Sequence, residues 1–137
     1  MGKNTSVYVD TSAFIAFLDK SDSYHPLFAQ LFSDPPKLIT SPLVINEGHA
    51  WFLRRYDIHR AFQFLNFVED LSPLSISDME RADLWNAAKI LKKFSDQPLT
   101  LADALGLYLM KSLSIKVCWS TDRHLGLNGS TLIIHQI

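Results

Sequence analysis

The sequence predicts an α/β fold with a mainly parallel central sheet and helices on both of its faces. Short β-rich runs alternate with longer segments of helical periodicity along the 137 residues, and this alternation is typical of βαβ units. Several helical segments also begin with recognisable capping residues. No repeat, low-complexity tract or long linker interrupts the pattern. A single domain over residues 1–137 is therefore expected.

Five short segments are predicted to form the strands. Each is rich in β-branched, aromatic or other apolar residues and is bounded by turn or helix-start residues. Because helical segments connect them, the strands are expected to lie parallel, with their carboxyl ends at one edge of the sheet. The segments are SVYV (6–9), KLIT (37–40), LSI (74–76), KVCWS (116–120) and TLIIH (131–135).

Two of the connecting segments begin with clear helix-start signals. Ser41 followed by Pro42 reads as an N-cap with a proline in the first turn, and it predicts a helix that runs to about Tyr56. Thr100 and Asp103 match a capping box, in which each side chain bonds the backbone N–H of the other residue. Helices are therefore expected after the second strand and before the fourth.

The segment after the third strand is expected to form a helix that packs on the core. Ser77 and Glu80 match a capping box at its start. Apolar residues then recur on what reads as one buried stripe at helical spacing. They are Met79, Ala82, Trp85, Ala88, Leu91 and Phe94.

The composition limits the classes of function. The formal net charge is −1 and the sequence pI is near 6.5, whereas a domain that binds nucleic acid through bulk charge is usually basic. Any polyanion must therefore be held locally or through a metal ion. The single cysteine, Cys118, cannot form an internal disulfide and fits a reducing compartment.

No apolar run reaches the roughly 18 residues needed to span a bilayer, so a cytoplasmic protein without a membrane segment is expected. The opening MGKNTS matches the short N-myristoylation pattern at Gly2. The strand expected from Ser6 disfavours that modification.

Four acidic residues occupy positions that are unusual for surface charges. Asp10 and Asp122 follow the first and fourth strands, so both are expected at the carboxyl edge of the sheet. Glu47 lies on the apolar face of the 42–56 helix, and Asp103 lies in the first turn of another. Each has a structural explanation as a helix cap, a turn residue or a side chain that reaches the rim. Together they predict a cluster of carboxylates in one cleft.

Such a cluster favours a particular chemistry. Neighbouring carboxylates repel one another unless a proton or a cation compensates their charge. Oxygen ligands favour Mg²⁺ or Mn²⁺, and the histidines and Cys118 show no pair at a spacing typical of zinc sites. Metal ions held in this way activate water and stabilise the leaving oxygen in phosphodiester hydrolysis.

Four segments, taken together, resemble the motifs of the PIN domain family, and specifically the small toxin nucleases of VapBC toxin–antitoxin modules. VDTSAFIAFLDKSD resembles the first motif, with Asp10 as a metal ligand and Ser12 as the small hydroxyl residue. The second motif is resembled by TSPLVINEGHAW, which gives Glu47. The third is resembled by PLTLADALGLYLMKSLSI, which gives Asp103, and the fourth by WSTDRHL, which gives Asp122. The resemblance spans nearly the whole chain in the family's order.

The resemblance implies a Mg²⁺- or Mn²⁺-dependent endoribonuclease that forms homodimers and is inhibited by an antitoxin peptide in its active-site groove. Thr121 is expected to support the site. The C-terminal GLNGSTLIIHQI lacks the Gly-aromatic pair that usually precedes the last strand, which affects the rim of the site. Asp19 and Asp22 resemble acids often found after the first helix but are expected to be solvated surface charges.

Contacts with RNA are only weakly indicated. Arg54 lies two helical turns beyond Glu47, and Arg123 follows Asp122, so both are candidate phosphate ligands as well as ordinary surface charges. Trp51 and Trp85 lie on apolar stripes, which favours core or dimer contacts over stacking with bases.

Two other functions compete with the nuclease. A phosphoacceptor signalling domain is also α/β with acids at strand ends, but it needs an aspartate and a lysine where this chain has Ser77 and Thr121 after its strands. A PIN-like domain that only binds RNA or a partner protein is the second alternative. The presence of all four acids argues against it.

A homodimer is expected from the distribution of phenylalanines. The segments HRAFQFLNFVEDL and SYHPLFAQLF carry apolar residues on more than one helical face, and such surface usually marks an interface. The alternative is that these side chains lie inside the chain's own core. The residues concerned in the first segment are Phe62, Phe64, Leu65, Phe67 and Val68.

Overall fold

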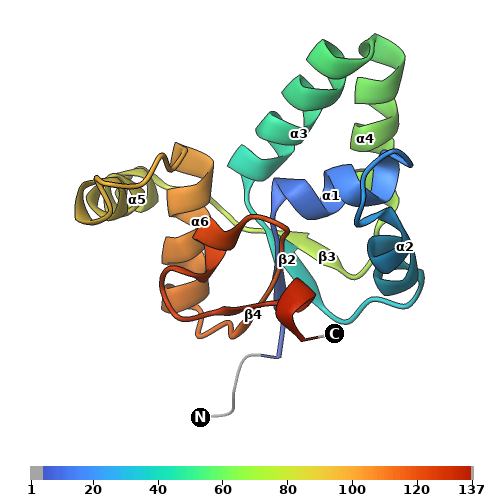
Figure 1. Ribbon diagram of the computed structural model, residues 1–137. Coiled ribbons are helices and arrows are strands. Elements are labelled where there is room, and N and C mark those ends of the chain that lie inside the picture. The colour runs from blue at the N-terminus through green and yellow to red at the C-terminus, as the bar shows by residue number, and fades with distance from the viewer. Residues whose placement is uncertain (1–4, 137) are drawn as a thin grey trace.

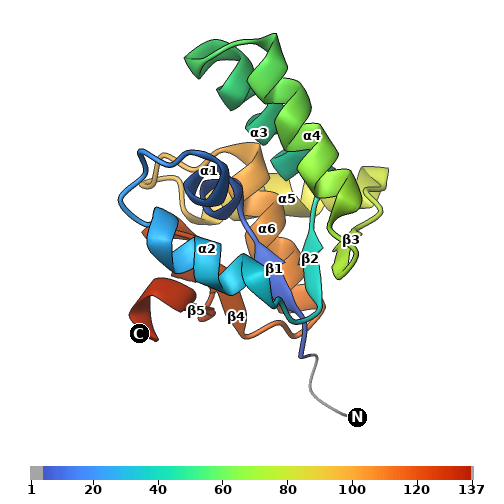
Figure 2. The ribbon, with the colours of Figure 1, turned by 90° about the vertical axis from the view of Figure 1, so that its right-hand side faces the viewer.

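The computed structural model describes residues 5–136 and contains a five-stranded sheet in the order β3-β2-β1-β4-β5 (Figures 1 and 2). Every neighbouring pair of strands is parallel. The predicted fold class is thus confirmed. The N-myristoylation pattern covers residues 1–6, and its glycine, Gly2, lies outside the described residues. The strands are β1 (Val7–Val9), β2 (Leu38–Thr40), β3 (Leu74–Ile76), β4 (Val117–Trp119) and β5 (Thr131–Leu132).

Helices cover the sheet on both sides. Figure 1 shows α5 and α6 on one side and α1 and α2 on the other, while α3 and α4 form a hairpin that projects from the carboxyl edge. Within residues 5–136, no helix is both long enough and apolar enough to cross a bilayer. The helices are α1 (Thr11–Leu18), α2 (His25–Ser33), α3 (Pro42–Arg55), α4 (Ile58–Asp70), α5 (Arg81–Lys93) and α6 (Leu101–Ser112), with 3-10 turns η1 (Arg123–Gly126) and η2 (Ile133–His135).

The central strand determines where the carboxyl edge of the sheet lies. Tyr8 and Val9 of β1 are fully buried, and β1 pairs with β2 on one side and β4 on the other. Asp10 follows β1 directly, and its backbone N–H donates to the carbonyl of Trp119 at the end of β4 (3.0 Å). The residues after β1 and β4 therefore lie side by side, as parallel pairing predicts.

The predicted starts of α3 and α6 are confirmed. Ser41 caps α3 and its hydroxyl accepts from the N–H of Val44 (3.3 Å). Both halves of the capping box between Thr100 and Asp103 are present at α6. Each bond satisfies a backbone N–H that the helix itself leaves without a partner.

The predicted start of α5 is wrong, and its predicted buried stripe is only partly present, since Met79 and Leu91 do pack against the core. The helix begins at Arg81, and its capping box joins Glu80 to Asp83 rather than Ser77 to Glu80. Trp85 is 61% exposed, and Ala87 is the buried residue of this helix. The physical reason is that a strict three-residue repeat rotates around a helix of 3.6 residues per turn, so it does not stay on one face. The last predicted strand is also shorter, because residues after Leu132 form η2.

The phenylalanines of α4 divide between core and surface. Phe64 is fully buried and lies against Gly48 of α3, where an added Cβ would come within 2.3 Å of the ring. Phe67 packs on the rings of Phe14, Phe17 and Phe32. Phe62, by contrast, is 55% exposed. Packing inside the chain's own core therefore accounts for part of the apolar excess in this segment but not for Phe62.

Asp19, expected as a solvated charge, is only 6% exposed. Its carboxylate accepts from the hydroxyl of Tyr56 (2.9 Å) and from the hydroxyl and N–H of Ser21. Arg60 lies over the Tyr56 ring (4.4 Å to the centroid) and donates to the carbonyl of Leu18 (2.9 Å). Burial raises the pKa of Asp19, but the bonds from Ser21 and Tyr56, with the charge of Arg60, hold that pKa below its ordinary value. We call these residues the Asp19 clasp, because they join the end of α1 to the α3–α4 hairpin.

Candidate active site

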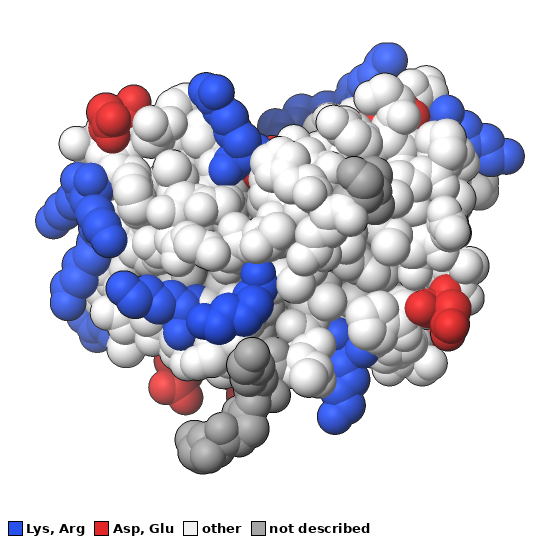
Figure 3. Space-filling model, turned by 60° about the horizontal axis from the view of Figure 1, so that its bottom comes forward, with Lys and Arg blue, Asp and Glu red and all other residues white. Residues whose placement is uncertain are grey.

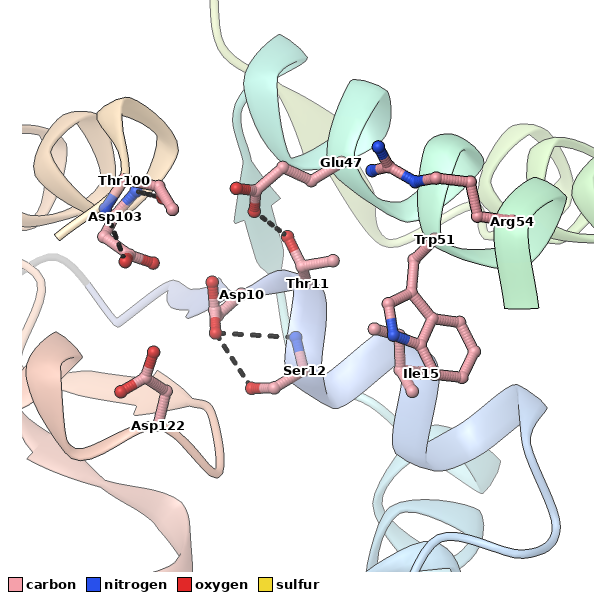
Figure 4. Close-up of a pocket in the computed structure, with 10 residues that line it drawn as sticks. All are labelled: Asp10, Thr11, Ser12, Ile15, Glu47, Trp51, Arg54, Thr100, Asp103 and Asp122. Carbon is pink, nitrogen blue, oxygen red and sulfur yellow. Dashed lines mark hydrogen bonds between the residues drawn. The ribbon is translucent and has the colours of Figure 1, made fainter. Parts of the chain in front are cut away.

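A pocket of about 320 Å³ opens at the carboxyl edge of the sheet, between α1, α3 and α6 (Figure 4). Four separate parts of the chain contribute to it: the start of α1, one face of α3, the first turn of α6 and the turn after β4. All four of the acidic residues that the sequence singled out line it. The lining residues are Asp10, Thr11, Ser12, Ile15, Glu47, Trp51, Arg54, Thr100, Asp103 and Asp122.

Asp10 lies at the bottom of this pocket and is 4% exposed. Its Oδ2 accepts from the hydroxyls of Ser12 (2.8 Å) and Ser120 (2.9 Å), and it also caps α1. Burial, together with the negative charge of Asp103, raises the pKa of Asp10 to about 6 against the bonds from the two serines. The cap role and the site role therefore belong to the same carboxylate.

Two serines organise the turn after β4. The hydroxyls of Ser12 and Ser120 lie 3.1 Å apart. The N–H of Thr121 donates to Ser12 Oγ (3.0 Å), and the N–H of Asp122 donates to Ser120 Oγ (2.9 Å). Thr121 thus contributes its backbone to this network. Ser120 was missed in the sequence, although it is a small hydroxyl residue at the carboxyl end of the fourth predicted strand, two residues before Asp122.

Asp103 faces Asp10 from the first turn of α6 and is 8% exposed. Its Oδ2 accepts from the N–H of Thr100 (3.0 Å), which is the capping bond. Burial and the negative charge of Asp122 raise the pKa of Asp103. Figure 4 shows its carboxylate directed into the pocket while that bond is made. Capping and a place in the site are again compatible.

Glu47 and Asp122 complete the acidic lining from two further elements. Glu47 is partly buried, and its Oε1 accepts from the hydroxyl of Thr11 (2.9 Å), a partner that the sequence did not reveal. Asp122 caps η1 and lies 2.8 Å from Nδ1 of His124. The other ring nitrogen of His124 is buried and has no hydrogen-bond partner within residues 5–136.

The chemistry of this donor set fits a hard divalent cation. All four side chains offer carboxylate oxygens, and Asp10 and Asp103 are buried where their charges need compensation. Within the described part of the chain, no three carboxylate, imidazole or thiol side chains lie close enough to form a ready-made metal site. The four carboxylates are instead spread around the wall of the pocket.

The two arginines proposed for RNA contact lie in different places. Arg54 lines the acidic pocket, and Figure 4 shows its guanidinium extending back along α3 on the side of Glu47. Arg123 is absent from that lining and borders a separate hollow near Leu132 and His135. Asp122 is the N-cap of η1 and Arg123 its first residue, and the two side chains border different hollows, so an RNA contact by Arg123 stays a prediction for a surface outside the acidic pocket.

The sequence model of the PIN domain matches residues 7–127. The chain belongs to the PIN domain family. It is similar to ribonuclease VapC26 of Mycobacterium tuberculosis, with 24% identity over 116 residues that cover 84% of this chain and 85% of the relative.

Two solved structures share the PIN domain fold of this chain. One is VapC20 of M. tuberculosis, described as a sarcin-ricin loop cleaving toxin, with a TM-score of 0.83 and 20% identity over 91% of this chain and 96% of that one. The other is PAE2754 from Pyrobaculum aerophilum, with a TM-score of 0.65 and 19% identity over 96% of this chain and 95% of that one.

The PIN domain match includes all ten residues that line the acidic pocket. It ends before β5 and η2, within the C-terminal stretch where the sequence departs from the pattern of the resembled nucleases. The pocket thus lies wholly within the matched part of the chain.

Proposed function

We propose that this PIN domain is an endoribonuclease that hydrolyses RNA phosphodiester bonds with Mg²⁺ or Mn²⁺. The observation that carries the proposal is that Asp10, Glu47, Asp103 and Asp122, from four separate parts of the chain, line one pocket. The names of the two mycobacterial relatives, a ribonuclease and a toxin that cleaves the sarcin-ricin loop, support the same substrate class.

The four carboxylates would hold the metal. When bound, the ion supplies an activated water for attack on phosphorus and stabilises the charge of the leaving oxygen. Ser12 and Ser120 orient Asp10 through their hydroxyls, and Thr11 orients Glu47. Arg54 offers a cation at the mouth of the pocket, where it can pair with an RNA phosphate.

The broader role is that of a toxin in a toxin–antitoxin pair in the cytoplasm. Its expected partners are an RNA substrate, an antitoxin protein and a second copy of the same chain. The similarity to two VapC proteins supports this role. Exposed apolar residues at the outer end of the α3–α4 hairpin support the protein partners.

The decisive experiment is cleavage of defined RNAs by the purified protein. A hairpin carrying the sarcin-ricin loop and a panel of unrelated structured RNAs are incubated with Mg²⁺, with Mn²⁺ and with EDTA. We expect cleavage of at least one RNA with either metal and none in EDTA, and no cleavage by Asp10→Asn or Asp103→Asn. Full cleavage in EDTA would rule out the metal mechanism. Binding without cleavage under every condition would favour the RNA-binding alternative.

A further inference from the structure

One wall of the acidic pocket is apolar and has no role in the hydrolysis proposed above. Ile15 of α1 and Trp51 of α3 form this wall, next to Ser12 (Figure 4). The inference that follows rests on the proposed nuclease function and concerns how the substrate is held. It assigns these two side chains to recognition of the RNA base.

Helices α1 and α3 meet in three successive layers that explain why the wall lies where it does. In the first layer Thr11 donates to Glu47 (2.9 Å), and in the last Tyr56 donates to Asp19 (2.9 Å). Ile15 lies one turn after Thr11, and Trp51 one turn after Glu47. The middle layer is therefore apolar and is held in register by a hydrogen bond at either end.

Trp51 is placed differently from the other two tryptophans. Trp119 is 2% exposed inside the core, and Trp85 is 61% exposed on α5. Trp51 is half-buried, meets the rings of Phe52 and Tyr56 at steep angles (82° and 67°), and borders the pocket. The expectation of a core contact therefore covers only part of this side chain. The rest is an anchored aromatic surface beside the catalytic acids.

The pocket thus presents three kinds of surface: carboxylates, an apolar wall, and the guanidinium of Arg54 on the side of Glu47. An RNA chain presents complementary groups, because each ribose links two phosphates and carries a flat base that projects to the side of the backbone. The volume of the pocket, about 320 Å³, is near the lower end for ligand pockets. A pocket of this size suits one nucleotide rather than a duplex. Aromatic side chains beside a cation are the usual platform for unpaired bases.

We propose that Trp51, backed by Ile15, stacks on the base next to the scissile phosphate, while Arg54 pairs with a neighbouring phosphate. Stacking needs an unpaired base, so the substrate is RNA that is single-stranded or looped at the cleavage point. Because every base has a π-face, Trp51 selects for an unpaired nucleotide more than for a particular base.

The first test is tryptophan fluorescence in an Asp10→Asn background, so that RNA binds without being cut. An RNA hairpin with an unpaired loop is expected to quench the emission, and a fully paired duplex of similar length is not. Trp51→Phe should remove the quenching, whereas the matched control Trp85→Phe should keep it. Quenching that persists in Trp51→Phe would overturn the proposal, as would a loop that produces none. This test does not depend on cleavage.

The second test is kinetic and uses the Asp10-containing enzyme. Stacking of this kind predicts that Trp51→Ala lowers kcat/KM roughly 5- to 100-fold, mainly through KM, and that Trp51→Tyr restores most of the loss. An RNA that lacks the base next to the cleaved bond should lower kcat/KM of wild type by the same factor. The same RNA should not lower kcat/KM of Trp51→Ala any further. Trp85→Ala should leave kcat/KM unchanged.

The control for packing is Trp51→Leu, which keeps an apolar side chain on α3. If Trp51→Leu cleaves as well as wild type, the wall serves packing only and the stacking role is wrong. If wild type cleaves with Mg²⁺ while Trp51→Ala is unimpaired, the nuclease function stands and this inference fails. If wild type cleaves no RNA at all, the proposed function fails, and the fluorescence test still decides whether Trp51 meets a base.

Discussion

At the scale of single residues, three of the four acids of this site combine helix capping with a place in the pocket. Asp10 caps α1 and Asp103 caps α6, yet both carboxylates also line the pocket. A cap bond uses one lone pair on one carboxylate oxygen and leaves others for a cation. The choice between structural and functional explanations, which the sequence leaves open for each residue, is therefore not exclusive.

Burial of Asp10 carries a cost that can be measured in the metal-free protein. Its pKa is raised from 3.8 to about 6 in the folded state, so the folded state binds the proton more tightly than the unfolded state does. The contribution of Asp10 to stability is then full below pH 3.8 and is lost as the pH rises through about 6.

We therefore predict that Asp10→Asn is more stable than wild type at pH 7.5 without metal, by roughly 1–2 kcal/mol. The gain is smaller than the whole shift because Ser12 and Ser120 bond a carboxylate more strongly than an amide oxygen. Urea unfolding at pH 7.5 and pH 4.5 measures the difference, which should shrink at the lower pH. A variant that is less stable than wild type at pH 7.5 would show that capping outweighs desolvation.

At the scale of helices and strands, local sequence signals predicted where the elements lie. They did not predict the side-chain contacts between elements that are far apart in the sequence. Strand positions and the caps at Ser41 and Thr100 follow from residues within four positions of each other, so the sequence contains them. Asp19 was misjudged because its partner Tyr56 lies 37 residues away, across the α1–α3 contact. The sequence indicated the four pocket acids because their motif order and the strand ends predict that they converge. The bond from Thr11 to Glu47, by contrast, is seen only in the side-chain contacts.

The Asp19 clasp predicts a second stability change, with the opposite dependence on pH. Tyr56→Phe removes the hydroxyl that donates to Asp19 and should destabilise the fold by roughly 1 kcal/mol at pH 7, since Tyr56 is 37% exposed. The folded pKa of Asp19 is lowered, so its contribution is present above the unfolded pKa of 3.8 and is lost as the pH falls through the folded value.

Urea unfolding of wild type and Tyr56→Phe at pH 7 and pH 3 would check this sign. The difference between the two proteins should be smaller at pH 3 than at pH 7, because protonation of Asp19 as the pH falls removes the charge that the hydroxyl of Tyr56 stabilises. Tyr24→Phe is a suitable control, because Tyr24 is also partly exposed and its ring has no part in the clasp. Phe keeps the ring that packs on Phe52 and Arg60, so an equal loss at both pH values would mean that the Tyr56 hydroxyl stabilises the fold independently of the charge on Asp19.

At the scale of the whole molecule, charge is not what attracts RNA. The formal net charge is −1. Figure 3 shows the side that includes the amino ends of the strands, where lysines and arginines are spread among uncharged residues and few acids appear. A diffuse distribution of this kind does not steer a polyanion strongly. The RNA affinity that the proposed function requires is therefore expected from the pocket at the opposite edge, where a bound metal ion, Arg54 and Trp51 would act together.

The exposed end of the α3–α4 hairpin predicts the assembly state. Leu53, Ile58 and Phe62 are 43%, 62% and 55% exposed there, and grouped apolar residues of this kind usually mark an interface. We expect a homodimer by light scattering, and a monomer for Phe62→Glu. Trp85→Glu is the control, since Trp85 is equally apolar and exposed on α5. Wild type with a monomer mass over a wide concentration range would contradict the dimer.

The layered contact between α1 and α3 also has a consequence for evolution and design. Its two hydrogen-bonded layers, Thr11 with Glu47 and Tyr56 with Asp19, hold the helices together on both sides of the apolar layer. Substitutions at positions 15 and 51 that keep their packing on the core are therefore expected to leave the pocket acids in place. Paired libraries of such apolar and aromatic substitutions are a compact way to change which nucleotide the proposed nuclease accepts.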